Sequence, residues 1–407
     1  MDTAPGSASG LTTSQRTHAV LAGYLGWTMD AFDFFVVVFM LGTLAEAFAV
    51  KKSEIVFTMT ITLAMRPVGA FLFGLLADRF GRRVPFMANV IYFSLIEVLC
   101  GFAPNYKVFL LLRALYGIGM GGEWGIGASL AMESIPQRLR GMVSGVLQSG
   151  YSAGYLLAAL AYRFVFPGLG WRWMFWIGGI PAVLALYIRW HVPESDAWKE
   201  HAANKVSDIM RVFAGYWKSF AYLLVMMTLF MFLSHGTQDL YPDFLKTEHN
   251  LSAAWVSYIA IIYNIGAIVG AIIFGLISQR MGRRKGIVFA LFLSFLTIPA
   301  WAFGHGLVVV AAAAFLMQVG VQGAWGVVPV HLNELAPDAA RGLVPGFAYQ
   351  LGILFASGTN NIEYALRDHF GYRWALAGFE IFTIISLAIV VWFGREAHGK
   401  QFSKLST

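Results

Sequence analysis

Apolar runs of about 20 residues alternate along the whole chain with short clusters of charged residues, proline and glycine. A helix that crosses the hydrocarbon of a bilayer needs about 20 predominantly apolar residues. Dividing the chain at the polar clusters predicts twelve spans: 18–48, 55–77, 84–103, 107–132, 141–163, 173–190, 218–245, 252–278, 286–305, 307–332, 341–363 and 373–394. The pattern therefore predicts an all-α polytopic membrane protein with twelve transmembrane helices.

Two polar loops with matching sequences reveal an internal repeat. Residues 74–83 read GLLADRFGRR, and residues 275–284, which lie 201 positions later, read GLISQRMGRR. The same offset relates further residues: Trp124 and Trp325, Glu133 and Glu334, Pro136 and Pro337, Arg140 and Arg341, Trp173 and Trp374. Because an Arg or Asp at the bilayer centre costs about 2.5–3.5 kcal/mol, both loops must lie in water. The chain is therefore two copies of one membrane half, with six spans in each.

This repeat sets the predicted domain organisation. We expect five parts: a cytoplasmic tail at 1–17, an N-terminal six-helix bundle at 18–190, a linker at 191–217, a C-terminal six-helix bundle at 218–394 and a second cytoplasmic tail at 395–407. The first 17 residues contain no apolar stretch, so we expect no cleavable signal peptide. Two interpretations of the linker stay open, an amphipathic helix on the membrane surface and a solvated connector.

Composition and charge agree with a membrane protein. The chain is 58% hydrophobic and 13% charged, whereas soluble domains carry about 25% charged residues. A net charge of +7 could indicate nucleic-acid binding, but the basic residues lie in short loops between apolar runs rather than on one patch. The single cysteine excludes an intrachain disulfide, and no CxxC or HExxH spacing indicates a metal. With no loop-borne nucleophile or cofactor motif either, we expect no cofactor and no enzymatic activity.

The distribution of Lys and Arg predicts the orientation. If both termini lie inside, most of the 29 basic residues fall on the cytoplasmic side, as the positive-inside rule requires. We therefore expect both termini in the cytoplasm and the protein in the inner (plasma) membrane of the cell.

Six plus six helices in a parallel repeat, with the loop Gly-x-x-x-Asp-Arg-x-Gly-Arg-Arg at 74–83, resemble the major facilitator superfamily over nearly the whole chain. In such proteins two halves rock about a midplane site. The resemblance implies a cytoplasmic gate that holds the halves together in the outward-facing state, formed by Asp78, Arg79, Arg82, Arg83 and Arg140. The alternative is that the loop only sets the topology through its positive charge.

Several charges lie within predicted spans, where they are costly and by default functional. The repeat shows that the fold does not need them, because the other half has uncharged residues at the equivalent positions: Ala267 for Arg66, Ala314 for Arg113, Ala324 for Glu123, Met231 for Asp30, Phe34 for His235 and Val38 for Asp239. These charges are asymmetric additions to a symmetric scaffold.

Arg66 lies near the middle of the second span. Its guanidinium is permanently charged and presents a planar fork that matches a carboxylate. Such a group needs an anion, and two interpretations stay open: the carboxylate of a substrate, or a structural bridge to Asp30 or Asp33.

Asp30 and Asp33 lie three residues apart on the first span and share one helix face. Two carboxylates this close in a low-dielectric site resist ionising together, which is the property that a proton-coupling group needs. The alternative is that they pair with Arg66 and Arg113. Glu123 is a further candidate for proton coupling, on a glycine-rich helix that permits close backbone approach, and it too could be structural.

The most specific motif is SHGTQDLYP at residues 234–242, on the seventh span. His235 and Asp239 are four residues apart and stack on one face, with Gln238 beside them. A His–Asp pair with an amide in a membrane span indicates a functional site rather than a core histidine. Pro242 has no N–H to donate and should bend or end the span.

This motif resembles the signature of Jen-type monocarboxylate–proton symporters of the sialate:proton symporter group, Asn-x-x-Ser-His-x-Ser/Thr-Gln-Asp-Leu-Tyr-Pro. Met231 stands where the family has its leading Asn. The resemblance implies symport of lactate, pyruvate or a similar short organic acid anion with a proton, by a monomer in the lipid bilayer. Together with the residue patterns above, it predicts these roles: substrate binding by Arg66, His235, Gln238, Asp239 and Tyr241, and proton coupling by Asp30, Asp33, Glu123 and Asp239. A larger acid, such as sialate or an aromatic acid, is the alternative, and a roomier, more hydroxyl-lined cavity would favour it.

Overall fold

The computed structural model describes residues 10–201 and 205–402, and the chain there is helical throughout its regular structure. The N-terminal half contains these helices: α1 (Thr13–Phe39), α2 (Leu41–Ala47), α3 (Lys52–Phe80), α4 (Arg83–Gly101), α5 (Tyr106–Ser134), α6 (Arg140–Phe164), α7 (Phe166–Leu169), α8 (Trp171–Ile177) and α9 (Pro181–His191). The first helix begins at Thr13, inside the stretch predicted as a tail, because the Thr12 side chain accepts a hydrogen bond from the Gln15 N–H and caps it. Residues 1–9 of that predicted tail lie outside the described residues.

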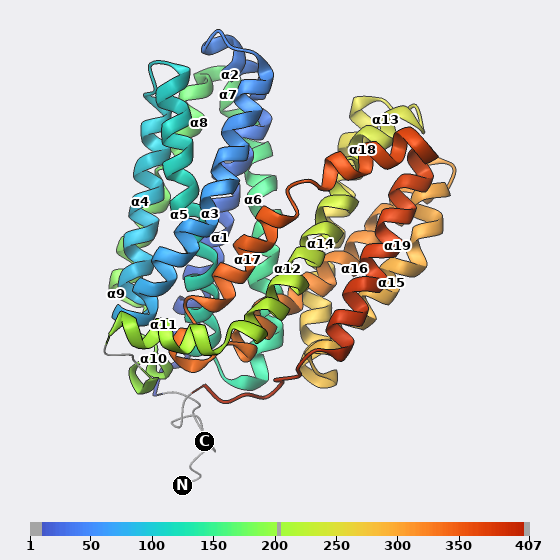
Figure 1. The fold of residues 1–407 in the computed structure, drawn as a ribbon. Coiled ribbons are helices and arrows are strands. Elements are labelled where there is room, and N and C mark those ends of the chain that lie inside the picture. The colour runs from blue at the N-terminus through green and yellow to red at the C-terminus, as the bar shows by residue number, and fades with distance from the viewer. Residues whose placement is uncertain (1–9, 202–204, 403–407) are drawn as a thin grey trace.

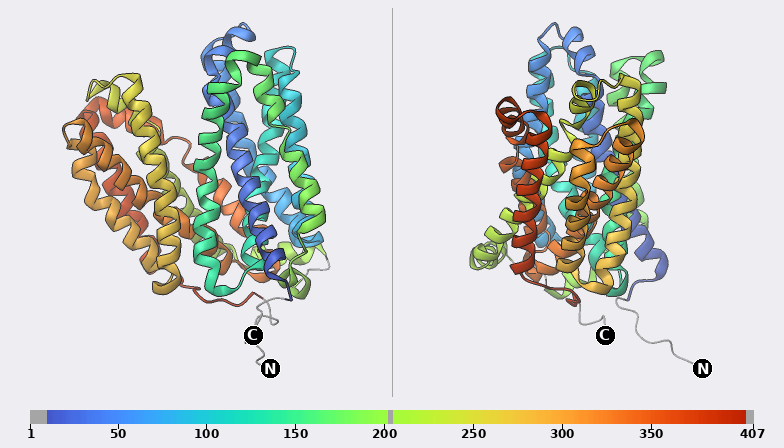
Figure 2. Two further views of the ribbon diagram at one scale, coloured as in Figure 1. Left: turned by 180° about the vertical axis from the view of Figure 1, so that it is seen from behind. Right: turned by 90° about the vertical axis from the view of Figure 1, so that its right-hand side faces the viewer.

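The C-terminal half repeats the arrangement. Its helices are the following: α12 (Trp217–Gln238), α13 (Tyr241–Thr247), α14 (Ala253–Met281), α15 (Arg283–Phe303), α16 (Leu307–Leu335), α17 (Val344–Phe355), α18 (Thr359–Phe370) and α19 (Tyr372–Phe393). One short 3-10 helix precedes α6 and another precedes α17. The two halves form separate bundles that approach each other near the end carrying both chain termini and diverge toward the opposite end (Figures 1 and 2). We call these the terminal end, where Arg82 and Arg341 lie, and the open end, where α13 and α18 lie.

The segment between the halves is helical where it is described. It forms α10 (Asp196–His201) and α11 (Val206–Gly215), while residues 202–204 lie outside the described residues. Ile209 of α11 is buried, whereas Val206 and Val212 are exposed. The linker is therefore helical where it is described, and its position on the membrane surface stays a prediction.

Four predicted spans consist of two helices rather than one. The interruptions are these: Met40 within 18–48, residues 178–180 within 173–190, residues 239–240 within 218–245, and residues 356–358 within 341–363. The helix break before Pro242 has a clear cause, since proline lacks an N–H and fits only the first turn of the new helix α13. The breaks at 239–240 and 356–358 both adjoin the cavity described below, where irregular backbone at membrane depth is tolerated.

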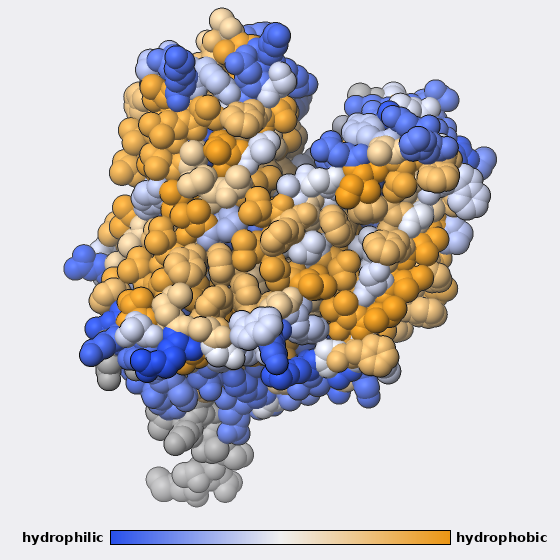
Figure 3. All heavy atoms as spheres, viewed as in Figure 1, coloured by the Kyte–Doolittle hydropathy of each residue, from blue (hydrophilic) through white to orange (hydrophobic). Residues whose placement is uncertain are grey.

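The surface is that of a membrane protein. Within the described residues, nine helical stretches are long and apolar enough to cross a bilayer. Hydrophobic residues form a broad band across both bundles, and hydrophilic residues gather at the two ends (Figure 3). The chain is therefore a multi-pass membrane protein.

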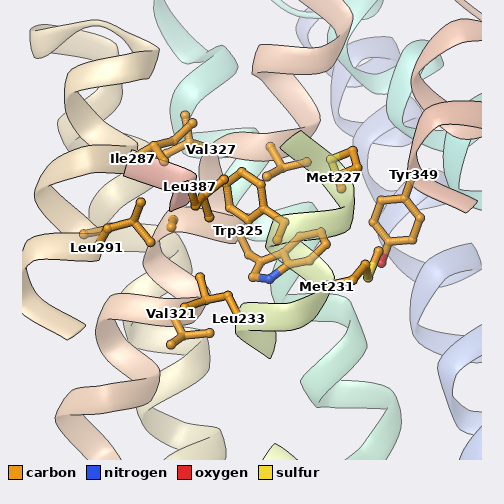
Figure 4. Close-up of a cluster of buried hydrophobic side chains, with 14 of the residues drawn as sticks. Met227, Met231, Leu233, Ile287, Leu291, Val321, Trp325, Val327, Tyr349 and Leu387 are labelled. Carbon is orange, nitrogen blue, oxygen red and sulfur yellow. The ribbon is translucent and has the colours of Figure 1, made fainter. Parts of the chain in front are cut away.

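A buried apolar cluster holds the C-terminal bundle together and reaches its inner face. Leu291 of α15, Leu387 of α19 and Leu233 of α12 surround Trp325, and Tyr349 of α17 lies at the side of this group toward the other bundle (Figure 4). The same continuous core includes side chains of the N-terminal half. This apolar contact between the halves is what positions the central cavity.

Candidate functional site

Arg66 is held at the middle of α3 by local sequence. A Cβ at Gly121 of α5 would collide with the carbonyl oxygen of Arg66, and one at Gly117 with that of Thr62. Small residues let membrane helices approach this closely, so the glycine-rich α5 fixes the position of α3. Pro67 also lacks an N–H, which leaves the carbonyl of Leu63 without its usual partner in the helix.

A cavity of about 120 Å³ lies between the two halves at this level. Arg66 and Tyr151 line it from the N-terminal half, and His235, Gln238 and Asp239 line it from the C-terminal half. The structure thus brings the arginine and the motif of the seventh span, which are far apart in sequence, to opposite walls of one space.

A second cavity of about 190 Å³ adjoins the first and shares His235 and Asp239 with it. It is lined further by Thr60, Ser357 and Asn360, at the open end. A larger groove of about 640 Å³ lies elsewhere among apolar side chains of α12, α18 and α19. That groove offers an anion no polar group, so the central cavities are the candidate site.

Arg66 has no anionic partner in this structure. Its side chain is 3% exposed, and its Nε and Nη2 atoms make no hydrogen bond. Among residues 10–201 and 205–402, no carboxylate oxygen lies within 4.0 Å of the guanidinium. The bridge to Asp30 or Asp33 that the sequence left open is therefore not formed, and the guanidinium faces the cavity without a direct ion pair, with Asp30 and Glu123 only within electrostatic reach.

The other arginine within a predicted span, Arg113, forms an ion pair. Its Nη1 donates to Glu97 Oε2 of α4 at 2.8 Å, and both side chains are fully buried. Glu97 was not among the predicted site residues, although it lies within the predicted span 84–103 and the rule for charges in spans applies to it. Arg113 is thus neutralised by Glu97 rather than by Asp30 or Asp33.

Asp30, Asp33 and Glu123 are buried in the N-terminal bundle behind the cavity wall. Both carboxyl oxygens of Asp33 and of Glu123 lack a hydrogen-bond partner, and the Asp30 carboxyl group accepts only from the Tyr116 hydroxyl, through Oδ1 at 3.4 Å. Glu123 reaches α1, where it lies against Gly26. Burying an ionised carboxylate without a partner is costly, whereas a protonated carboxyl group is neutral.

The motif on α12 forms a polar network at the cavity. His235 Nδ1 lies 3.1 Å from Asp239 Oδ2, and the side chain of Asp239 is 36% exposed to the cavity. Two glutamines of α16 support this helix through side-chain hydrogen bonds: Gln238 donates to Gln318 at 2.9 Å, Gln318 donates to Thr237 at 3.1 Å, and Gln322 donates to Ser234 at 3.3 Å. The network holds the His–Asp pair toward Arg66.

Tyr241 lies away from this network. It is 1% exposed, stacks on Trp301 at 4.8 Å between ring centroids, and donates to the Trp301 carbonyl at 3.4 Å. It lines neither central cavity. The chain turns at residues 239–240, so that Tyr241 begins α13 and packs against α15 instead of continuing the face of His235.

Aromatic residues close the cavity toward the terminal end. Trp124 stacks on Tyr349 across the two halves at 4.3 Å, and Trp325 packs against the same ring at 5.5 Å. Trp27 contacts both Tyr349 and Tyr151. These aromatic residues were not among the predicted site residues, although Trp124 and Trp325 occupy equivalent positions in the repeat.

At the terminal end, Asp78 bonds directly across the interface. Its Oδ1 accepts from the Gly342 N–H at 2.7 Å, and its Oδ2 accepts from the Leu343 N–H at 2.9 Å. Arg82 donates to the same Oδ1 at 2.6 Å. Of the predicted gate residues, Asp78 thus contacts the other half directly, and Arg82 holds the Asp78 carboxylate in position.

Ion pairs around Asp78 follow the repeat. Arg82 bonds Glu133 at 3.0 Å, and the equivalent Arg283 bonds Glu334 at 2.8 Å. Arg341 crosses the interface to Glu133 at 3.1 Å. Glu133 and Arg341 are buried gate residues that the sequence prediction did not include, although both belong to matched pairs of the repeat.

The remaining predicted gate residues differ in what they reach. Arg79 is partly exposed and lies over the ring of Phe80, and Arg83 donates to the Arg189 carbonyl, so both stay within the N-terminal half. Arg140 instead donates to the Lys400 carbonyl at 2.6 Å.

The segment 395–402 contacts both halves at the terminal end. The Phe402 ring lies between Arg140, at 3.6 Å, and Arg341, at 4.0 Å. Lys400 also bonds Asp338 at 3.0 Å. Burial lowers the pKa of the Lys400 ammonium below its usual value. This part of the predicted tail is therefore packed against the terminal end.

A model of the protein family described as "Sugar (and other) transporter" matches residues 18–214 and, separately, residues 206–398. The chain belongs to this family. It is a transporter of the major facilitator superfamily and not an enzyme. The two matches correspond to the two halves of the internal repeat.

Two relatives are transporters of organic acids by name. A "Carboxylic acid transporter protein homolog" of Saccharomyces cerevisiae is 32% identical over 385 residues, which are 88% of this chain and 62% of the yeast protein. The sialic acid transporter NanX of Escherichia coli is 27% identical over 391 residues, 95% of this chain and 96% of the relative. The chain thus spans less than two thirds of the yeast protein and nearly all of the bacterial one.

A solved structure has the same fold. The proton:xylose symporter XylE, bound to 6-bromo-6-deoxy-D-glucose, superimposes with a TM-score of 0.78 over 97% of this chain and 99% of XylE, at 20% sequence identity. At this identity the similarity establishes the fold alone.

Proposed function

We propose that this transporter of the major facilitator superfamily carries short monocarboxylates, such as lactate or pyruvate, together with protons. It acts as a monomer of twelve spans with both termini in the cytoplasm, so that the terminal end is the cytoplasmic end. The name of the yeast relative supports a carboxylic acid as the substrate class, and the following geometry supports the mechanism.

The observation that carries this proposal is that the Arg66 guanidinium is buried without an ion pair. A guanidinium that is 3% exposed and lacks a carboxylate partner is unfavourable unless an anion enters the cavity that it lines. Its planar fork can donate two parallel hydrogen bonds to a carboxylate. Arg66 is therefore the anchor for the acid group of the substrate.

The opposite wall binds the rest of the substrate. His235, Gln238 and Asp239 offer hydrogen-bond donors and acceptors to a hydroxyl or keto group that lies beside the carboxylate. Because these groups belong to the other half, one substrate molecule contacts both bundles. Binding can then favour the conformations in which the bundles approach each other around it.

Asp30, Asp33 and Glu123 are the groups that bind the transported proton, with Asp239 as a further acceptor at the cavity. The first three are buried and have unsatisfied carboxyl oxygens, and Asp30 and Glu123 interact electrostatically with Arg66. Protonation of one of them changes the charge of the site by one unit. The charge of an entering carboxylate is thereby matched by a proton, and this links the two cargoes.

The conformation corresponds to the outward-facing state. The cavities continue toward the open end, while Asp78, Arg341 and the aromatic residues close the terminal end. Transport to the cytoplasm requires these contacts to break and the bundles to rock. Asp78 therefore acts on the balance between conformations rather than on substrate binding.

The size of the site favours a short acid over a larger one. Ligand pockets for drug-sized molecules measure about 300–1,000 Å³, and the two adjoining cavities, of about 190 and 120 Å³, together lie at the lower end of that range, the smaller one at Arg66. Few hydroxyl groups line it, namely those of Ser234, Tyr151 and Tyr349. A sialate-sized substrate would need a roomier site with more hydroxyl groups.

Uptake by purified protein in vesicles tests the proposal. Labelled lactate should accumulate when the outside is acidic, and a protonophore should abolish the accumulation. A panel of pyruvate, an aromatic acid and sialate added as competitors should show competition by pyruvate alone. Equal uptake driven by sodium at constant pH, or competition by sialate but not by pyruvate, would refute it.

A further inference from the structure

Two buried carboxylic acids of the C-terminal half have no role in the mechanism above. Glu363 of α18 and Glu380 of α19 are both fully buried, and none of their four carboxyl oxygens makes a hydrogen bond. Neither is within 4.0 Å of a basic nitrogen among the described residues. Buried carboxyl groups without hydrogen bonds are unusual in proteins. Asp33 and Glu123 in the other half share this property.

Their positions connect them with the central site. Glu363 follows Thr359 and Asn360 by one helical turn on α18, and those two residues line the cavity that contains His235 and Asp239. The Asn360 Oδ1 atom is also buried without a partner. The face of α18 that borders the cavity therefore leads directly to Glu363.

Glu380 lies on the other side of the same region. A Cβ at Gly236 of α12 would collide with Glu380 Oε1, so this carboxyl group rests against the helix backbone beside His235. Glu380 interacts electrostatically with Glu363, and Glu363 interacts electrostatically with Asp239. The Thr383 hydroxyl, one turn further on α19, is buried and unpartnered as well.

The repeat shows that the scaffold does not require these acids. The equivalent positions in the N-terminal half hold Tyr162 and Gly179. The situation mirrors that of Asp30 and Glu123, whose equivalents in the C-terminal half are Met231 and Ala324. Each half thus carries buried acids that the other lacks.

We propose that Glu363 and Glu380 form a second proton-binding site, which takes up a proton from the cavity at Asn360 and exchanges it with the His235–Asp239 pair. A carboxyl group gains one proton and loses one negative charge, and no other bond changes. The inference rests on the proposed proton coupling and adds to it a site in the C-terminal half. Protons then have an acceptor on either side of the substrate.

Infrared difference spectroscopy on the purified protein tests the site without any substrate. Acidification of the wild type should change the high-frequency part of the carbonyl band, where protonated carboxyl groups that make no hydrogen bonds absorb. Glu363→Gln and Glu380→Gln should each remove part of that change, whereas the control Glu248→Gln should not, because Glu248 is partly exposed and pairs with Arg373. Unaltered band changes in both variants would overturn the proposal.

Transport by the same variants provides the second measurement. For each proton carried with lactate, a gradient of one pH unit supports about tenfold accumulation. The Gln variants should accumulate less lactate than the wild type while exchanging lactate across the membrane at the wild-type rate. A purely structural role would instead lower accumulation and exchange together.

The two proposals fail in different ways. If the wild type transports no lactate but the Gln variants lose part of the infrared band, the substrate is wrong and the second site stands. If a Gln variant does not fold, Glu363→Asp and Glu380→Asp keep an ionisable group and should keep the accumulation ratio. Loss of accumulation in folded Asp variants with an intact band would contradict the proposal.

Discussion

At the terminal end, the N-terminal and C-terminal halves of this transporter are built alike. Two contacts recur at the offset of the repeat: Arg82–Glu133 with Arg283–Glu334, and Asp78–Gly342 with Gln279–Gly141. In each half, a side chain accepts a hydrogen bond from the backbone N–H of the equivalent glycine in the other half. In each half, too, a buried ion pair at equivalent positions stabilises the loop. Residues that the halves share therefore serve the scaffold and its closure.

At the level of the cavity, the halves differ. The N-terminal half has Arg66 where the other has Ala267, and the C-terminal half has His235 where the other has Phe34. Charges that occur once in a duplicated scaffold are unnecessary for its folding. Under the proposed mechanism, the residues for closure are therefore paired in the repeat, and the residues for transport are not.

The largest effect on stability should come from breaking a shared contact. Arg82→Ala and Arg283→Ala each leave a buried glutamate without its arginine, and removing one partner of a buried ion pair costs about 3–5 kcal/mol. Thermal unfolding in detergent should show a large loss for both variants. The control Arg79→Ala, at a partly exposed residue that lies over a ring, should unfold like the wild type. Similar stabilities of all three variants would contradict the paired role.

Asp78→Asn should weaken closure without harming the site. Asn offers one carbonyl oxygen in place of two carboxylate oxygens, and hydrogen bonds to charged groups contribute about 1.5–3 kcal/mol. Gln279 shows that an amide is tolerated at the equivalent position. Lactate should bind as in the wild type, while net uptake should slow. Loss of binding by calorimetry would place Asp78 in the site instead, and Asp196→Asn serves as the control at the same end.

The smallest effect should come from the segment 395–402. Phe402→Ala removes a buried ring that lies between Arg140 and Arg341, and a desolvated cation–π contact contributes about 2 kcal/mol. We expect a slightly lower unfolding temperature and faster lactate exchange. Phe393→Ala, at an exposed ring of α19, is the matched control. Exchange slower than in the wild type would show that the segment promotes opening.

Much of this comparison was accessible from the sequence. The apolar runs and the repeat predict the membrane class and the two halves, because burial in lipid imposes length and polarity on every span. The cost of charge in hydrocarbon singles out Arg66, and the helical spacing of His235 and Asp239 predicts that their side chains meet.

What escaped prediction depends on backbone bends and tertiary packing. Pro242 predicts the break at residues 239–240, but no sequence pattern shows that the break turns Tyr241 toward Trp301 and away from the cavity. The stacking of Trp124 on Tyr349 joins two halves whose relative placement no local pattern encodes. The cost of charge in hydrocarbon applies to Glu363 as it does to Arg66. Glu363, however, lies at the edge of the predicted span 341–363, where a charged residue does not appear unusual.

Lactate binding to the Arg66→Ala variant, by calorimetry on purified protein with thermal unfolding in parallel, tests the central claim most directly. The variant should fold and lose binding, because a lost hydrogen bond to a charged group costs about 1.5–3 kcal/mol and more when buried. Arg66→Lys should bind weakly, since lysine keeps the charge but not the fork. Arg163→Ala, at an exposed arginine of α6, should bind normally. A folded Arg66→Ala variant with wild-type affinity for lactate would contradict the account.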